Sequence, residues 1–317
     1  MSLDRVPSSA PGEGGVACPC AGHRAPLGNI LVASDFEEDA GWALDRALWL
    51  CRRDGATLEM FHVMPAPHDD DAVAARMESE AGHQLARART AAATTLRGRG
   101  GDDGLLFAAL ARGAAYAQIA ERAHHGRAEL VVVGRHGERS FGELLIGSTA
   151  ERVIRTGSTS VLVVAGPPTG PYRRPLVAVD GSASSRLAFE LTARLCPGSQ
   201  GEIDVVHVTG PSRLPIGGDL PVVATTPTLR EVERRTRAEL EECLTGLGLD
   251  ARWNLYVVDG DPRTQILAHA RAHHSDLVAL GTHGRTGLRR VLLGSVAEAV
   301  IRGAAADVLV ARLPSTD

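Results

Sequence analysis

The fold is decided by one stretch, Gly134-Arg135-His136-Gly137, which is followed by nine residues and then by Gly147-Ser148. An apolar run from Leu130 to Val133 precedes it, and a helical pattern follows it. A strand, a glycine-bounded loop and a Gly-Ser entry to a helix are typical of a phosphate cradle. Glycines let the backbone approach the anion, and free N–H groups at the start of the helix point at it. The serine can cap the helix or bond a phosphate oxygen.

The same pattern occurs a second time, 147 positions later (281 − 134), as Gly281-Thr282-His283-Gly284 and Gly294-Ser295. Between 134–155 and 281–302, 11 of 22 positions are identical. Asp35 and Asp180, which end the first apolar run of each half, differ by a similar offset of 145 (180 − 35). This spacing indicates the duplication of one domain.

Short apolar runs alternate with helical patterns in both halves of the chain. This alternation predicts the α/β class, with two tandem doubly wound domains, each built on a five-stranded parallel sheet covered on both faces. The expected divisions are a disordered tail at 1–25, a first domain at 26–165, a Gly/Pro-rich linker at 166–173 and a second domain at 174–313. The irregular segment from Pro211 to Pro227 is either a lid, a partner surface or simply a mobile loop.

Composition narrows the function. The chain has 317 residues, a net charge of −4 and a pI near 6.3, which argues against nonspecific binding to nucleic acid. Its apolar runs have the length of strands, and no signal-peptide pattern or disulfide framework stands out, so we expect a cytoplasmic protein that does not enter a membrane. All 34 basic residues are arginine, which excludes any mechanism that requires a lysine at the phosphates.

These residues resemble the universal stress protein family in its tandem, two-domain form. Both copies fit the family's nucleotide signature G-x2-G-x9-G-[S/T], and Val258-Asp259-Gly260-Asp261-Pro262 resembles the family's turn before the third helix. The resemblance covers about 27–165 and 174–313. It implies an adenine-nucleotide α-hydrolase-like fold with strand order 3-2-1-4-5. It also implies an intramolecular pseudo-dimer in which the fifth strands lie near the pseudo-twofold axis, and a homodimer of such chains is plausible.

The resemblance further implies one ATP site in each copy, with Mg²⁺ as a candidate counter-ion of the phosphates. The aspartate that ends the first strand faces adenine, the valine that ends the second strand contacts adenine through its backbone, and the glycines and hydroxyls hold ribose and phosphates. In the first copy the matching positions are Ala33, Asp35, Val63, Gly134, Gly137, Gly147, Ser148 and Thr149. In the second copy they are Ala178, Asp180, Val208, Gly281, Gly284, Gly294, Ser295 and Val296.

The two copies differ in charge at these sites. The first loop of the first copy carries the acids Asp35, Glu37, Glu38 and Asp39, where the second copy has Ser182 and Ser184. Between the glycines, Glu138, Arg139 and Glu143 sum to −1, whereas Arg285, Arg289 and Arg290 sum to +3. The first copy also reads Ala111-Arg112-Gly113-Ala114 where the family favours a proline. We therefore expect the second site to bind ATP more tightly.

The expected function is that of a cytosolic ATP-binding regulator of the stress response, which acts through nucleotide-dependent conformation or through unidentified protein partners. It is not expected to be an enzyme beyond slow ATP hydrolysis, because no acidic motif that could hold a metal accompanies the cradle. Two alternatives stay open. One is a nucleotide-independent scaffold, and the other is a hydrolysing or adenylate-forming enzyme of the wider superfamily.

Several polar residues have simpler interpretations. Asp35 and Asp180 could cap the helices that follow them, and His62 and His207 are expected to be satisfied core histidines. His136 and His283 in the glycine loops could act as general bases, although no orienting partner is visible.

His124-His125 and His273-His274 are expected to end helices, where a cationic ring favours the helix dipole. Cys18, Cys20 and His23 lack the paired spacing of a zinc site, so no metal site is predicted. Cys51, Cys196 and Cys243 are interpreted as small buried hydrophobic residues.

Overall fold

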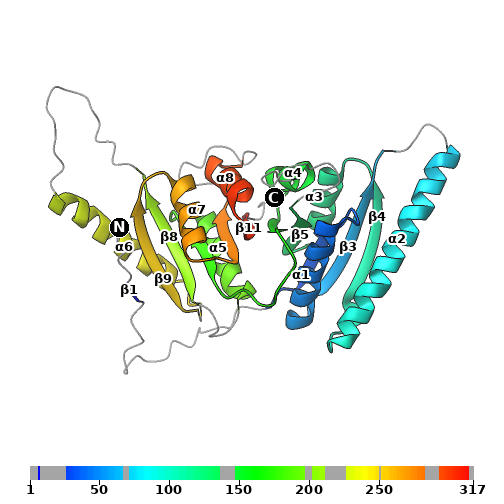
Figure 1. Ribbon diagram of the computed structural model, residues 1–317, viewed down its shortest axis with the longest axis horizontal. Helices are drawn as coiled ribbons and strands as arrows, with labels where there is room; N and C mark the ends of the chain where they lie inside the picture. The colour runs from blue at the N-terminus through cyan, green and yellow to red at the C-terminus, as the bar shows by residue number, and fades with distance from the viewer. Residues whose placement is uncertain are drawn as a thin grey trace.

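The computed structural model describes residues 6–7, 26–66, 71–135, 147–196, 202–210, 226–249, 251–282 and 293–313. Within these residues, all strands belong to one sheet with the order β1-β9-β8-β7-β10-β11-β6-β5-β2-β3-β4 (Figure 1). Each half of the sheet has its own set of helices, and the two halves meet at its centre (Figure 1).

The first half follows the strand–helix alternation that the sequence predicts. Its elements are β2 (Asn29–Ala33), α1 (Glu38–Asp54), β3 (Thr57–Met64), α2 (Asp71–Gly98), β4 (Leu106–Arg112), α3 (Ala115–His125), β5 (Leu130–Gly134), α4 (Ser148–Thr156) and β6 (Ser160–Val164). The neighbouring strands β4, β3, β2, β5 and β6 pair parallel. This arrangement confirms the α/β class and the strand order 3-2-1-4-5.

The second half repeats the first. Its elements are β7 (Pro175–Ala178), α5 (Ala183–Leu195), β8 (Ile203–Thr209), α6 (Thr226–Thr245), β9 (Trp253–Asp259), α7 (Pro262–Ala272), β10 (Leu277–Gly281), α8 (Ser295–Gly303) and β11 (Asp307–Ala311). The order β9-β8-β7-β10-β11 is again 3-2-1-4-5, with parallel pairing throughout. The described α6 begins at Thr226, and most of the segment from Pro211 to Pro227 lies outside the described residues.

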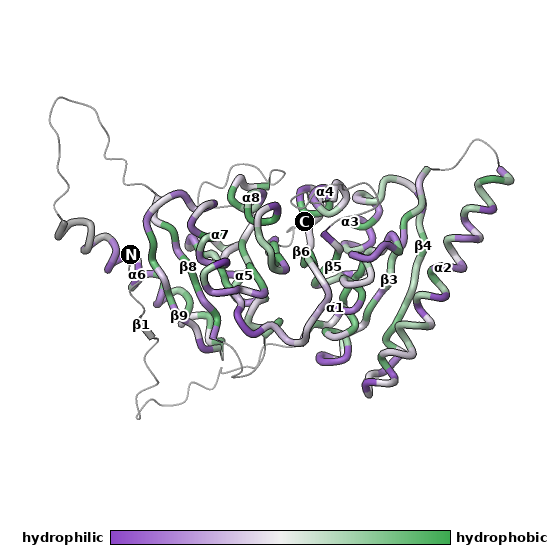
Figure 2. The backbone as a smooth tube through the Cα atoms, in the orientation of Figure 1, coloured by the Kyte–Doolittle hydropathy of each residue, from purple (hydrophilic) through white to green (hydrophobic). Residues whose placement is uncertain are grey.

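Helices cover both faces of the sheet and give it two hydrophobic layers. One layer joins the strands to α1, α2, α5 and α6, and the other joins them to α3, α4, α7 and α8. Strands buried on both sides must be apolar at every position, which explains runs such as β5, whose residues Leu130 to Val133 are all buried. Figure 2 shows this contrast between hydrophobic strands and the mixed polarity of the outer helix α2.

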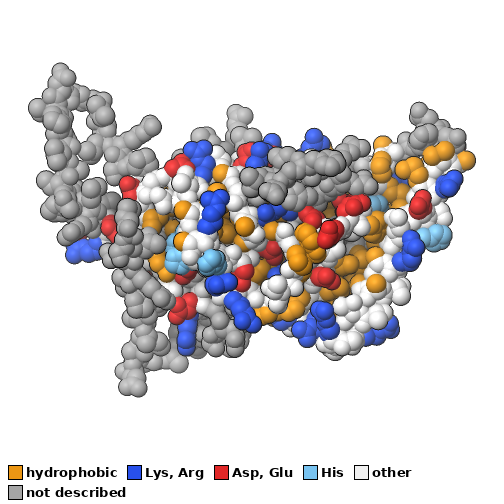
Figure 3. Space-filling view, in the orientation of Figure 1, with side chains coloured by type: hydrophobic (Ala, Val, Ile, Leu, Met, Phe, Trp, Pro, Cys, Tyr) orange, Lys and Arg blue, Asp and Glu red, His pale blue; other side chains and the backbone are white. Residues whose placement is uncertain are grey.

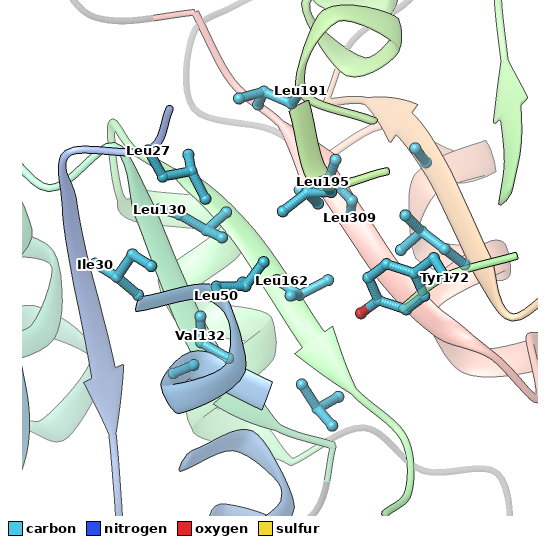
Figure 4. Close-up of a cluster of buried hydrophobic side chains, with 14 of the residues drawn as sticks. Leu27, Ile30, Leu50, Leu130, Val132, Leu162, Tyr172, Leu191, Leu195 and Leu309 are labelled. Atoms are coloured by element: carbon cyan, nitrogen blue, oxygen red, sulfur yellow. The ribbon is translucent and has the colours of Figure 1, made fainter. Parts of the chain in front are cut away.

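The two halves are joined by their fifth strands, β6 and β11, which pair antiparallel through Leu162 and Leu309 and their neighbours. Both leucines are 0% exposed. Figure 4 shows that they share one hydrophobic cluster with Leu195 and Tyr172, to which both halves contribute. This pairing is the intramolecular contact that the resemblance implies.

The two ends of the chain add small features. Val6–Pro7 forms the short strand β1, which pairs antiparallel with β9, and the rest of 1–25 lies outside the described residues. None of the helices among the described residues has the length and apolar character that crossing a membrane requires.

Candidate functional site

A cavity of about 440 Å³ opens at the carboxyl ends of β2 and β5 in the first half. Strand order reverses between these two strands, and ligands of open α/β sheets bind at this place. The lining comes from the ends of β2, β3 and β5 and from the starts of α1, α3 and α4: Ala33, Ser34, Asp35, Ala40, Phe61, Val63, Pro65, Gly113, Ala115, Ile119, Val133, Gly134, Gly147, Ser148, Thr149 and Ala150.

The cavity brings together seven of the eight residues predicted for the first site. They are Ala33, Asp35, Val63, Gly134, Gly147, Ser148 and Thr149. Gly137, the eighth, lies outside the described residues, as do His136 and the charged residues of the same loop. The lining combines apolar side chains such as Phe61 and Val63 with a nearly equal share of polar surface, and Asp35 is the one charged side chain among its described residues.

The start of α4 supplies the polar part of the cavity. Its N-cap, Gly147, has no side-chain capping bond, so no described side chain satisfies the first N–H groups of the helix. The N–H of Gly147 itself donates to the carbonyl of Arg135 (2.6 Å) and closes the neck of the glycine loop. The N–H groups of Ser148, Thr149 and Ala150 are therefore the donors that an anion would meet first.

Gly134 has a packing role as well as a place in the cavity. A Cβ at Gly134 would lie 2.7 Å from the carbonyl carbon of Asp39, and one at Gly281 would lie 2.8 Å from the Cβ of Ser184. These contacts are too short for any side chain. The first glycine of each loop thus allows α1 or α5 to approach the neighbouring strand, a function that the sequence analysis did not assign to it.

Asp35 and Asp180 form equivalent turns. Asp35 Oδ1 accepts the N–H of Glu37 (3.2 Å), and Asp180 Oδ1 accepts the N–H of Ser182 (3.0 Å). Each carboxylate therefore shapes the turn before its helix, but neither aspartate is the N-cap: Glu37 holds that position in α1, and Ser182 caps α5 by accepting the N–H of Ser185. The capping interpretation was wrong in this respect, and Asp35 also lines the cavity. The residue that follows the aspartate has a positive φ in both copies: 67° at Phe36 and 81° at Gly181.

His207 is a satisfied core histidine, as expected, whereas His62 is only partly buried although its ring also has a partner. The Nδ1 atom of His62 lies 2.7 Å from the carbonyl oxygen of Ser34, and that of His207 lies 2.7 Å from the carbonyl oxygen of Val179. Each imidazole holds the end of the first strand against the second strand. His62 also packs against Phe36, with ring centroids 4.4 Å apart.

The second half places its predicted residues in the same arrangement. Ala178 and Asp180 lie at the end of β7, Val208 lies in β8, and Gly281 ends β10. Gly294, Ser295 and Val296 start α8, whose N-cap again has no side-chain bond. The N–H of Gly294 donates to the carbonyl of Thr282 (3.0 Å), as that of Gly147 does to Arg135. Gly284 and His283 lie outside the described residues.

Arg135 is a residue beside the site that sequence reasoning did not single out. It is 7% exposed, and its Nη2 donates to the carbonyl of Ala306 in the second half (2.8 Å). Burial lowers its pKa from the ordinary value, and the carboxylates of Asp307 and Asp39 oppose that shift. The cation thus joins the first site to the other half. The second copy has Thr282 at this position, so the repeat gave no signal for it.

The fold and the site define a tandem α/β protein with a cavity and an uncapped helix start at the switch point of its first sheet. The chain belongs to the universal stress protein family, whose model matches residues 26–165 and 171–312.

Individual relatives agree with this assignment. A universal stress protein of Mycolicibacterium smegmatis is 33% identical over 193 residues, which is 58% of this chain and 62% of that protein. The chain thus aligns with less than two thirds of that relative's length. A universal stress protein of Methanocaldococcus jannaschii is 28% identical over 149 residues, 46% of this chain and 85% of that protein. The crystal structure of a universal stress protein from Archaeoglobus fulgidus shares the fold, with a TM-score of 0.64, 18% identity, and coverage of 90% of this chain and 98% of that one.

Proposed function

We propose that this chain is a cytoplasmic ATP-binding regulator of the stress response, in which the nucleotide biases conformation or partner binding. The observation that carries the proposal is the cavity of about 440 Å³ that ends at the uncapped start of α4. Its apolar walls suit a base, and the N–H groups of the first helical turn suit phosphates. The equivalent start of α8 supports a second site.

The lining favours binding over catalysis. Phosphoryl transfer needs a placed metal, a base and cations aimed at the transferred group. Among the described lining residues, Asp35 alone carries a charge, and its Oδ1 is engaged with the N–H of Glu37. Such a lining can hold a nucleotide but offers little to stabilise a transition state. Mg²⁺, where it takes part, would accompany the phosphates of ATP.

A nucleotide-independent scaffold is the second candidate. Asp35 lines the first cavity, Glu37 and Glu38 follow it within three positions, and all three acids are exposed. Their charge opposes a triphosphate, and this observation favours the scaffold for the first half alone. In either case we propose that the two halves act as one unit, with further self-association of the chain as an option.

The test is the number of nucleotides that the tag-free chain carries, counted by native mass spectrometry and identified after denaturation. Gly147→Asp and Gly294→Asp are the informative variants. Both glycines are N-caps with φ/ψ values that any residue can adopt (−59°/139° and −64°/145°), and aspartate is a favoured N-cap. An aspartate at either position can therefore cap its helix while its carboxylate occupies the place of the anion. A Cβ at Gly294 would lie 3.1 Å from the carbonyl oxygen of Thr282, so thermal melts must establish that the variants are folded.

Because the second loop has the larger positive charge, we expect Gly294→Asp to remove more bound ATP than Gly147→Asp. A larger loss from Gly147→Asp would reverse the ranking of the sites. A parent chain that binds no nucleotide even after ATP is added would refute ATP binding and leave the scaffold.

A further inference from the structure

A cluster of two histidines and one aspartate lies in the second half, away from the nucleotide sites. His269 is on α7, His273 follows the end of that helix, and Asp204 is the second residue of β8. The nucleotide sites occupy the carboxyl ends of the strands, whereas Asp204 lies at the amino end of its strand. Figure 3 shows histidine side chains at the surface beside α7.

The potential donor atoms of the cluster converge. Asp204 Oδ2 is 3.5 Å from His269 Nε2 and 3.2 Å from His273 Nδ1, and the three residues present ligand atoms that all lie within 4.8 Å of one another. The histidines are four positions apart, so consecutive turns of α7 place them on one face. Two imidazoles and a carboxylate form a donor set that Zn²⁺ and other first-row divalent cations bind.

His269 gives an independent indication of a ligand. Its side chain is 3% exposed, and its Nε2 is a buried atom with no hydrogen-bond partner among the described residues. The nearest acceptor, Asp204 Oδ2, lies 3.5 Å away, at the limit of hydrogen-bond distance, so this buried nitrogen has lost its interaction with water and gained at most a weak contact in its place. A metal ion between Nε2 and Asp204 would supply the missing interaction.

The surroundings orient the carboxylate as a metal site requires. Asn254 Nδ2 donates to Asp204 Oδ1 (3.3 Å) and to Glu202 Oε2 (2.9 Å), which leaves Oδ2 turned toward the imidazoles. Tyr256 closes one side, with its ring edge-on to His269 and His273 at 4.6 Å and 5.5 Å. Supporting contacts of this kind fix ligand geometry in metal sites.

We propose that Asp204, His269 and His273 form a site for a divalent first-row cation such as Zn²⁺, with one coordination position open to solvent. The two rings are stacked 4.0 Å apart and within 7° of parallel. Lone pairs in parallel planes do not meet at one point, so binding requires one ring to turn. His273 is the ring that turns, because its side chain is 30% exposed and stands at the helix end.

The first half shows what the same positions do without these donors. Glu59 is the equivalent of Asp204, because Glu59 pairs with Phe107 of β4 in the sheet as Asp204 pairs with Asn254 of β9. Arg122 is the equivalent of His269 at the repeat offset of 147 (269 − 122). There Arg122 Nε donates to both carboxylate oxygens of Glu59, at 3.1 Å and 3.0 Å. An arginine cannot ligate a metal, and Gly126 replaces His273. We therefore expect one cation per chain.

The test uses the full chain without a histidine tag, stripped with EDTA and titrated with Co²⁺, whose visible absorption reports its coordination. The test variants are His273→Gln and Asp204→Asn, which change partly exposed side chains. The matched controls are His274→Asn, a neighbouring histidine outside the cluster, and Cys18→Ser with Cys20→Ser, which removes two of the three other candidate ligands. Thermal melts establish that each variant is folded, and the nucleotide count keeps this test separate from that of the ATP proposal.

We expect one Co²⁺ per parent chain, displaced by Zn²⁺, and a loss of affinity of more than about tenfold in both test variants. Both controls should bind as the parent does. The His273 Cε1–H signal should lose the ring-current shift of the stack when diamagnetic Zn²⁺ is added. The proposal is overturned if the parent binds no Co²⁺, if His273→Gln binds as tightly as the parent, or if binding disappears with the two tail cysteines.

Discussion

At the scale of single residues, glycine has a different role at each place in the repeat. Gly134 and Gly281 let a helix touch a strand, Gly147 and Gly294 begin helices, and Gly181 has a positive φ that Phe36 must adopt in the first copy. The signature was predicted as a phosphate cradle, and its described part lines the first cavity. The packing role of Gly134 could not be predicted, because it depends on Asp39, 95 positions away (134 − 39).

This packing role leads to a prediction for Gly134→Ala and Gly281→Ala. The new Cβ would lie under 3.0 Å from Asp39 or Ser184, so the helix must shift. We expect each variant to lower the free energy of unfolding by about 1–3 kcal/mol, as overpacked sites do. Urea denaturation measures it. Gly210→Ala, where no atom lies within 4 Å of the new Cβ, is the control. Equal stability of all three variants would contradict the packing role.

Cys51 supports a prediction about pH. Burial is the main cause that raises the pKa of its thiol to about 11, and the thiol donates to the carbonyl of Ala56 (2.9 Å). Since only the thiolate reacts, we expect Cys51 in the native chain at pH 8 to resist a disulfide reagent and to react once urea unfolds the protein. Labelling followed by peptide mass spectrometry measures this. Equal rates in both states would be inconsistent with burial.

The sign of the linkage follows from the raised pKa. The folded state favours the neutral thiol, so the contribution of Cys51 to stability is complete below the ordinary pKa of about 9 and is lost as pH rises through about 11. Cys51→Ala should therefore show a smaller loss of stability than the parent between these pH values.

At the scale of elements, most boundaries could be predicted from periodicity and punctuation. The turn Val258-Asp259-Gly260-Asp261-Pro262 was expected to precede a helix, and α7 begins at Pro262. In the predicted turn before α7, Gly260 has φ of 135° and Asp261 caps the helix by accepting the N–H of Thr264 (3.1 Å). Local chemistry sets such ends, so the sequence alone reveals them.

The long helix α2 offers a test of propensity. Gly82 lies inside it, and a Cβ there would meet no atom within 4 Å. We expect Gly82→Ala to raise the free energy of unfolding by about 1 kcal/mol, because alanine loses less backbone entropy in a helix than glycine does. Gly55, the C-cap of α1 with φ of 67°, is the matched opposite. Gly55→Ala should cost about 1–2 kcal/mol, and a stabilising effect there would contradict the left-handed cap.

At the scale of the whole molecule, the sequence predicted two similar domains and a linker but not the polar cluster that joins them. Asp307 in β11 accepts the N–H of Ala165 (2.8 Å) and the hydroxyl of Tyr172 (2.6 Å). Arg46 of α1 lies over the Tyr172 ring (4.1 Å) and donates to the carbonyl of Gly170 (2.7 Å). These partners are more than 100 positions apart in most pairs, so no local pattern links them. The cluster of Asp204, His269 and His273 also escaped prediction, because Asp204 lies 65 positions before His269 (269 − 204) and His273 was interpreted only as a helix end.

Tyr172→Phe tests this junction. Burial raises the pKa of Asp307, and the bonds from Ala165 and Tyr172 oppose the rise because they stabilise the carboxylate. Removing the hydroxyl should lower the free energy of unfolding by about 1–3 kcal/mol at pH 7, where the carboxylate would lose a partner. Because its pKa is raised, the contribution of Asp307 to stability is complete at low pH, where it is protonated, and is lost as pH rises. Protonated Asp307 carries no charge for the Tyr172 hydroxyl to stabilise, so the defect of Tyr172→Phe should shrink toward pH 4.

Urea denaturation at both pH values measures the effect of Tyr172→Phe. Tyr116→Phe, which changes a tyrosine outside the junction, is the control. A defect of the same size at pH 4 and pH 7 would show that the hydroxyl does not act through the Asp307 carboxylate.

The antiparallel pairing of β6 with β11 has a further consequence. Since one chain supplies both strands, the two halves associate within the same molecule and do not have to find each other by diffusion. Dilution therefore does not separate them. Each molecule also carries one acidic and one basic version of the glycine loop, always in equal number. A dimer of two identical subunits could not combine two different loops, because any change in one subunit would appear in the other. Covalent fusion thus lets the halves diverge into different tasks while each keeps its partner.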